Sequence, residues 1–97
     1  MTETAKPATS TLQTENGRTR VTEWRFQPGE STGWHRHDLD GVVIPITSGR
    51  LTSVESSGDR VEIDLEAGVA MTFEAGWEHD VIFDGPGEFV FVEVELK

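Results

Sequence analysis

The sequence has no cysteine, no tyrosine and few basic residues. Without cysteine there is no disulfide framework, no thiol nucleophile and no cysteine-ligated zinc. Lysine and arginine number 8 against 18 aspartate and glutamate residues, which gives a formal net charge of −10. This balance argues against nucleic acid or an anionic membrane as partner, because both attract clustered basic side chains. The only lysines are Lys6 and Lys97, and their positions near the two ends disfavour Schiff-base chemistry.

Long apolar runs and helical periodicity are missing as well. No apolar segment is long enough to cross a bilayer, and the first residues lack the basic start and apolar stretch of a secretory signal. We therefore expect a cytoplasmic protein. A chain of 97 residues is expected to form one domain with a modest core.

Short apolar and alternating segments separated by turns take the place of helices. β-Branched and aromatic residues dominate these segments, which are typical of strands. Turn residues recur about every 8–12 residues, a spacing that predicts an antiparallel β-sandwich or barrel. The expected strands cover residues 21–26, 42–46, 51–54, 60–65, 69–73, 79–83 and 89–96. The fold class is therefore all-β.

The first part of the chain differs from the rest in composition. Residues 1–17 are mostly threonine, alanine, glutamate and serine and offer little to bury. We expect this part to be a flexible or strand-swapping arm, and residues 18–97 to form the barrel.

The histidines carry the functional signal. His35 and His37 are separated by one residue, so on a strand their side chains point to the same face. Two imidazoles placed in this way can bind one divalent metal ion if the fold brings a third ligand to them. The alternative is a pair of strand histidines that face solvent or are satisfied in the core.

Two spaced motifs resemble those of the cupins. The first consists of Gly29, His35, His37 and Gly49, and the second of Gly68, Glu74-Ala75-Gly76 and His79. Together the motifs extend the resemblance over residues 21–96. Within the family, the segments 33–37, 42–45 and 91–97 are similar to those of small single-domain bacterial cupins labelled as β-alanine degradation proteins.

The resemblance implies an antiparallel jelly-roll barrel with a metal near its middle, held by His35, His37 and His79. Family spacing puts a metal-binding glutamate at Val42, where this chain has none. The site therefore resembles that of the three-histidine cupins. Three neutral imidazoles leave the ion its full +2 charge and an open position, which favours an anionic ligand or the activation of water or dioxygen. Iron, nickel, manganese, cobalt and zinc all remain candidates.

A pocket beside the metal is predicted from the strands that carry the motifs. Val42 and Ile44 are expected on the ligand-bearing face, as are Val81 and Phe83 beside His79. An apolar lining of this kind suits a small organic ligand and equally suits a filled barrel core. Asp40 is a further candidate, through a water molecule on the metal. Trp34 is expected to point away from the histidines as a core or dimer contact.

Three functional hypotheses follow. The first is a metal-dependent enzyme of the dioxygenase or Lewis-acid type acting on a small carboxylate or dicarbonyl metabolite. The three-histidine thiol dioxygenases use a tyrosine that this chain lacks, which counts against thiol oxidation. The second is a non-catalytic module that binds or senses a small ligand, and the third is a structural metal. In each case we expect a homodimer formed by sheet packing.

Overall fold

The alternating segments form strands throughout the part of the chain that the computed structural model describes, residues 6–97. None of these residues is helical, so none forms a helix that is long and apolar enough to span a membrane. The strands are β1 (Lys6–Pro7), β2 (Thr9–Glu15), β3 (Thr19–Phe26), β4 (Glu30–Ser31), β5 (His35–Arg36), β6 (Asp40–Pro45), β7 (Gly49–Glu55), β8 (Arg60–Leu65), β9 (Met71–Phe73), β10 (Glu78–Phe83) and β11 (Phe89–Leu96).

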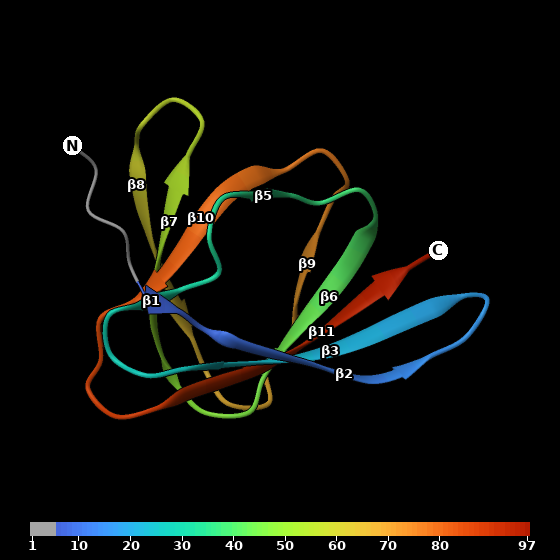
Figure 1. Ribbon diagram of the computed structural model, residues 1–97, viewed down its shortest axis with the longest axis horizontal. Helices are drawn as coiled ribbons and strands as arrows, with labels where there is room; N and C mark the ends of the chain where they lie inside the picture. Colours follow the sequence, from blue (N-terminus) through green and yellow to red (C-terminus); the bar gives the residue numbers. More distant parts are fainter. Residues whose placement is uncertain (1–5) are drawn as a thin grey trace.

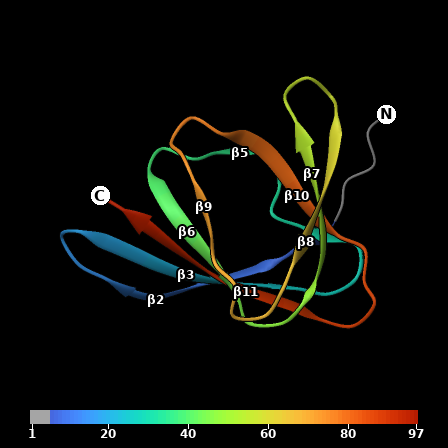
Figure 2. The ribbon, with the colours of Figure 1, turned by 180° about the vertical axis from the view of Figure 1, so that it is seen from behind.

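Two sheets face each other and close into a jelly-roll barrel, as predicted. One sheet has the order β1-β4-β10-β7-β8, with β5 also paired to β10, and the other has the order β2-β3-β11-β6-β9. Figure 1 shows β7, β8 and β10 on one side of the molecule and β2, β3 and β11 on the other, and Figure 2 shows the same separation from behind. Every pairing except that of β1 with β4 is antiparallel.

The core is a cluster of phenylalanines contributed by both sheets. Phe26 and Phe89 are fully buried, and Phe83 is only 2% exposed. The Phe83 and Phe89 rings lie 5.6 Å apart and the Phe26 and Phe91 rings 5.7 Å apart, within the range of favourable aromatic pairs. Phe73 connects this cluster to the histidines, because its ring lies 4.3 Å from that of His37.

The predicted N-terminal arm is ordered in the part that the structure describes. The strand β2 pairs with β3 of the same chain, with a bulge between Leu12 and Thr14, and β1 pairs with β4 in the other sheet. Every residue of β1 and β2 is nonetheless exposed, which agrees with the low apolar content of this segment. Residues 6–15 thus contain edge strands of the barrel, whereas residues 1–5 lie outside the described residues. Exchange of β2 between two copies stays a prediction.

Candidate metal centre

The pairing of β5 with β10 brings the three histidines together. His35 is the direct cross-strand partner of His79, so both side chains point to the same face. His37 follows β5 and is held by the turn that precedes β10. Its backbone N–H donates to the Trp77 carbonyl at 2.8 Å, and its carbonyl accepts from the N–H of Gly76 at 2.7 Å. These backbone hydrogen bonds therefore hold the segment that carries His35 and His37 against the start of β10, which carries His79.

The Nε2 atoms of the three imidazoles converge on one point. The Nε2 atoms of His35 and His37 lie 3.1 Å apart, and those of His37 and His79 lie 3.0 Å apart. One nitrogen from each residue falls within 4.8 Å of the others. Three imidazoles can share an ion about 2.0–2.1 Å from each nitrogen only if the nitrogens are this close. The three predicted ligands are thus assembled in the structure.

Hydrogen bonds at the other ring nitrogens fix the tautomers of two histidines. The Nδ1 of His35 lies 2.9 Å from the carbonyl oxygen of Gly33, which can only accept, so Nδ1 carries the proton. In the second case the Ser53 hydroxyl donates to the Glu55 carboxylate, and its oxygen accepts from Nδ1 of His79 at 2.7 Å. Both histidines therefore present an unprotonated Nε2 to the centre.

This arrangement fits a cation. The Nε2 lone pairs of His35 and His79 both point at the Nε2 of His37, which holds at most one proton. At least one pair of nitrogens then faces lone pair to lone pair at about the hydrogen-bond distance, which is unfavourable without a positive charge between them. A divalent ion removes this conflict, and the donor set of three imidazoles suits several transition metals.

Burial favours the neutral form of two of the imidazoles, His37 and His79. It lowers the pKa of His37 to about 4, with the charge of His35 adding to the effect and Asp38 opposing it. It also lowers the pKa of His79 to about 4, with His35 and His37 adding to the effect. The neutral imidazole is the form that binds a metal.

A carboxylate and an indole support His79 from behind. The Ser53 hydroxyl, followed by the Trp77 indole, lowers the pKa of Glu55, so this residue is a charged acceptor. Trp77 donates from Nε1 to Glu55 at 2.8 Å, and its ring lies 3.7 Å from that of His79. Ser53 is completely buried. The imidazole of His79 is thus held in orientation by a chain of three side chains, as is common for metal-binding histidines.

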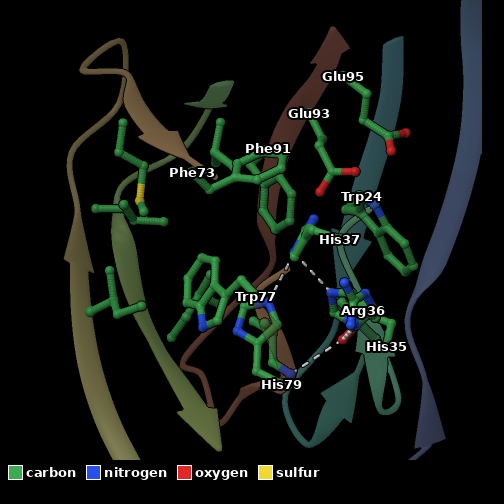
Figure 3. Close-up of a pocket in the computed structure, with 17 residues that line it drawn as sticks. Trp24, His35, Arg36, His37, Phe73, Trp77, His79, Phe91, Glu93 and Glu95 are labelled. Carbon is green, nitrogen blue, oxygen red and sulfur yellow. Dashed lines mark hydrogen bonds between the residues drawn. The ribbon is translucent and has the colours of Figure 1, made fainter. Parts of the chain in front are cut away.

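The histidines line a cavity of about 120 Å³ between the two sheets. Figure 3 shows them facing Trp77 and Phe73 on one side and Trp24 on the other, with Glu93 and Glu95 beyond His37. The other lining residues are Thr32, Arg36, Val43, Leu51, Ile63, Leu65, Met71, Val81 and Phe91. The cavity is therefore mostly apolar and aromatic, with a polar group of imidazoles and a separate pair of carboxyls.

Of the five residues predicted beside the metal, only Val81 lines this cavity. Phe83 lies on the same face of β10 but is buried in the phenylalanine cluster. Val42 and Ile44 do not line the cavity, because Val43 between them does, and alternation turns the neighbours of Val43 to the opposite face of β6. Asp40 does not line the cavity either, since it is exposed and accepts the backbone N–H of Ala75 at 2.8 Å.

Val42 stands at the position of the family glutamate but points outward, and Gly41 is the inward position just before it. A Cβ on Gly41 would overlap the Phe73 ring and the Val94 carbonyl, so an aromatic ring occupies the space that a longer side chain would need. Val42 forms a pair with Val94 on the outer face of the sheet. The inner face of β6 therefore supplies no carboxylate to the histidines.

The two tryptophans next to the ligands differ in their surroundings. Trp77 lines the cavity and stacks on His79. Trp34 is 52% exposed, and its indole N–H lies 3.3 Å from Glu78. Trp34 is therefore not a core residue, and its alternative role as a dimer contact stays a prediction.

Sequence reasoning missed Glu93 and Glu95. Both belong to the stretch of alternating glutamate and apolar residues that ends β11, a pattern that is typical of a solvated face. The register with β3 sets Glu93 opposite Thr22 and Phe91 opposite Trp24, and Trp24, Phe91 and both glutamates line the cavity. The sequence held no signal for this orientation, because the apolar set of Val92 and Val94 would ordinarily be assigned to the inner face.

Comparisons with known proteins agree with this geometry. A family model described as the cupin domain matches residues 22–95. The chain is 49% identical over 90 residues to the β-alanine degradation protein BauB of Pseudomonas aeruginosa, covering 93% of this chain and 94% of that protein. A cupin domain from Bordetella pertussis superposes with a TM-score of 0.93 at 47% identity, with 99% of each chain covered. A double-stranded β-helix protein from Klebsiella pneumoniae has a TM-score of 0.77 at 22% identity over 98% of this chain and 81% of its own, which bears on the fold alone.

Proposed function

Because the chain belongs to the cupin domain family, we propose that it is a metal-dependent enzyme acting on a small carboxylate-bearing or dicarbonyl metabolite. His35, His37 and His79 hold one divalent transition-metal ion. Such an ion, bound by three neutral imidazoles, supplies a +2 charge and open positions for an anionic ligand or dioxygen. The observation that carries the proposal is the convergence of three Nε2 atoms on the wall of a largely apolar cavity between the two sheets.

The chain's own residues prepare this site in two ways. Ser53 and Gly33 accept the Nδ1 protons of His79 and His35, so the nitrogens that face the cavity stay unprotonated. Phe73, Trp77 and Phe91 restrict the remaining space with aromatic surface. A small ligand that enters exchanges water contacts for contacts with aromatic rings, and its anionic group is directed to the histidine end.

The size of the cavity supports a small metabolite. Its volume of about 120 Å³ holds a molecule of a few carbon atoms. The name of BauB refers to the degradation of β-alanine, and three-carbon carboxylates of that kind are consistent with this volume. We therefore infer a short carboxylate as the substrate class.

Two measurements test the proposal. The first is elemental analysis of protein purified without an affinity tag, beside a variant with His35, His37 and His79 changed to alanine; near-stoichiometric metal lost in the variant is expected. The second incubates the metal-loaded protein with a mixture of short carboxylates, with and without dioxygen, and follows their signals by NMR. Consumption in the wild type and not in His79→Ala supports an enzyme. Binding without turnover would support the ligand-binding module instead, and negligible metal in both proteins would refute the metal site.

A homodimer remains part of the proposal. The outer face of the β2-β3-β11-β6-β9 sheet carries Val92 opposite Ile44, and Val94 opposite Val42 and Val21. These side chains are only partly buried within one chain. Packing against the same face of a second copy would remove this apolar surface from water, as is common in two-fold symmetric dimers.

A further inference from the structure

Glu93 occupies an unusual place for a charged residue. It lies in β11, a strand with β3 on one side and β6 on the other, so it stands in the interior of its sheet and not at an edge. Its direct neighbours across the two ladders are Thr22 and Val43. Val43 is buried and lines the cavity, and Glu93 lines it as well. The Glu93 side chain therefore points into the barrel, on the side of His37 (Figure 3).

The Glu93 carboxyl has no partner within residues 6–97. No hydrogen bond or ion pair joins it to another described residue, whereas Glu95, two positions on, lies 3.5 Å from Nε of Arg20. Burial, and after it the neighbouring charge of Glu95, raises the pKa of Glu93 to about 7, and Arg20 opposes the shift. This carboxyl is partly buried and faces the cavity, so its oxygens can accept donors from a molecule bound there.

Glu93 does not belong to the group of residues that converge for a metal. Among residues 6–97, that group contains only the three histidines. The aromatic side chains of Trp24 and Phe91 also line the Glu93 end, and Phe91 is the next inward residue of the same strand. The cavity thus has two chemically different ends: imidazoles that suit a cation with an anionic ligand, and a carboxyl among aromatic rings.

We propose that Glu93 binds the positively charged amino group of the substrate, so that the site selects short amino acids over carboxylic acids that lack the amine. The inference rests on the proposed function, because it assumes that the substrate carboxylate lies at the histidine end. An ammonium group supplies the donors that the Glu93 carboxyl lacks within the described chain. The faces of Trp24 and Phe91 favour a cation in the same place.

The charges at the two ends also orient the ligand. A divalent ion at the histidines attracts the carboxylate and repels the ammonium group, and Glu93 does the opposite. A short chain of methylene groups between the two fits the apolar walls formed by residues such as Val43 and Phe73. A ligand without the amine would keep the interaction of its carboxylate with the metal but leave Glu93 without a partner. A site discriminates strongly against a ligand that leaves one of its charged groups unpaired.

The experiment compares two probes on the metal-loaded full chain by isothermal titration calorimetry. The probes are 3-aminopropanoate and propanoate, which differ only in the amino group. The variant is Glu93→Gln, which keeps the shape and removes the charge, and the control is Glu23→Gln. Glu23 lies opposite Val92 on the outer face of the sheet, so the control removes the same net charge far from the cavity. Metal content is measured in each sample to show that the histidine end is intact.

The expected result is that the wild type and Glu23→Gln bind 3-aminopropanoate about tenfold or more tightly than propanoate, the size of effect that a charge-assisted hydrogen bond gives. Glu93→Gln should lose this preference and keep its affinity for propanoate. Equal affinity for both probes in the wild type, or a preference that survives in Glu93→Gln, would overturn the role of Glu93 while leaving the proposed function in place. Failure of the metal-loaded wild type to bind either probe would overturn both.

Discussion

The hydroxyl of Ser53 provides a quantitative test of how the site is held. Its oxygen accepts the Nδ1 proton of His79 at 2.7 Å, and the hydroxyl proton goes to Glu55. Because Ser53 is completely buried, water has no access to replace the lost group in Ser53→Ala. His79 would then lose the interaction that fixes its tautomer and orientation. Loss of such a partner lowers metal affinity by about 10- to 100-fold, or about 1.4 to 2.7 kcal/mol.

The same substitution should also weaken the metal-free fold. It leaves the Nδ1 proton of His79 buried without an acceptor, which costs about 1–3 kcal/mol. The assay is a competition titration of zinc or cobalt against a chelator, with circular dichroism to confirm that the variant is folded. Thr52→Ala is the matched control, because Thr52 is also buried, with 8% exposure, and alternation turns its side chain away from Ser53. Metal affinity in Ser53→Ala equal to that of the wild type and of Thr52→Ala would refute the reasoning.

Three further predictions concern Glu93, the packing of Gly41 against Phe73, and the outer face of the sheet. In the metal-free wild type the pKa of Glu93 is raised from the ordinary 4.5 to about 7, so its free energy of unfolding relative to that of Glu93→Gln should fall as pH rises between these values. In urea denaturation this fall is expected to reach up to about 3 kcal/mol. A difference in unfolding free energy that does not change with pH would contradict the assignment. Gly41→Ala should lose about 1–3 kcal/mol because its Cβ overlaps the Phe73 ring, whereas Gly17→Ala, which has open space around it, should be nearly neutral; equal unfolding midpoints would argue against the packing described here. Light scattering should give twice the monomer mass of 10.7 kDa for the wild type and the monomer mass for Val92→Glu, and a monomeric wild type would rule out the proposed interface.

The sequence was informative about the metal ligands because their spacing is a local property. The one-residue gap between His35 and His37 determines a shared face on any extended segment, and the second motif places His79 after a turn that leads into a strand. The cross-strand pairing of His35 with His79 then depends on the global fold, which the family resemblance supplied. The cluster of three histidines and the all-β architecture could both be predicted on these grounds.

The face of β6 could not be predicted in the same way. Residues 38 and 39 separate His37 from the start of this strand, and an irregular connection does not preserve alternation. An error of one residue turns every side chain to the other face, which is why Val43 and not Val42 reaches the cavity. Apolar residues on both faces of β6 gave no signal to choose between the two registers.

The inward orientation of Glu93 and Glu95 on β11 could not be predicted for a related reason. The alternating glutamates of this strand have the pattern of a solvated face, and only the pairing with β3 and β6 shows that Glu93 and Glu95 point inward. The outer face carries the apolar side chains of Val92 and Val94, so the usual rule that apolar residues mark the inner face fails for this part of β11.

The most direct test of the central claim is anomalous diffraction from crystals of the metal-loaded protein, measured at the absorption edge of the metal. The account predicts one strong peak per chain, about 2.0–2.2 Å from the Nε2 atoms of His35, His37 and His79. The Nδ1 atoms of His35 and His79 should keep their hydrogen bonds to Gly33 and Ser53. A peak elsewhere in the chain, coordination through Nδ1, or no peak after loading would contradict the three-histidine site.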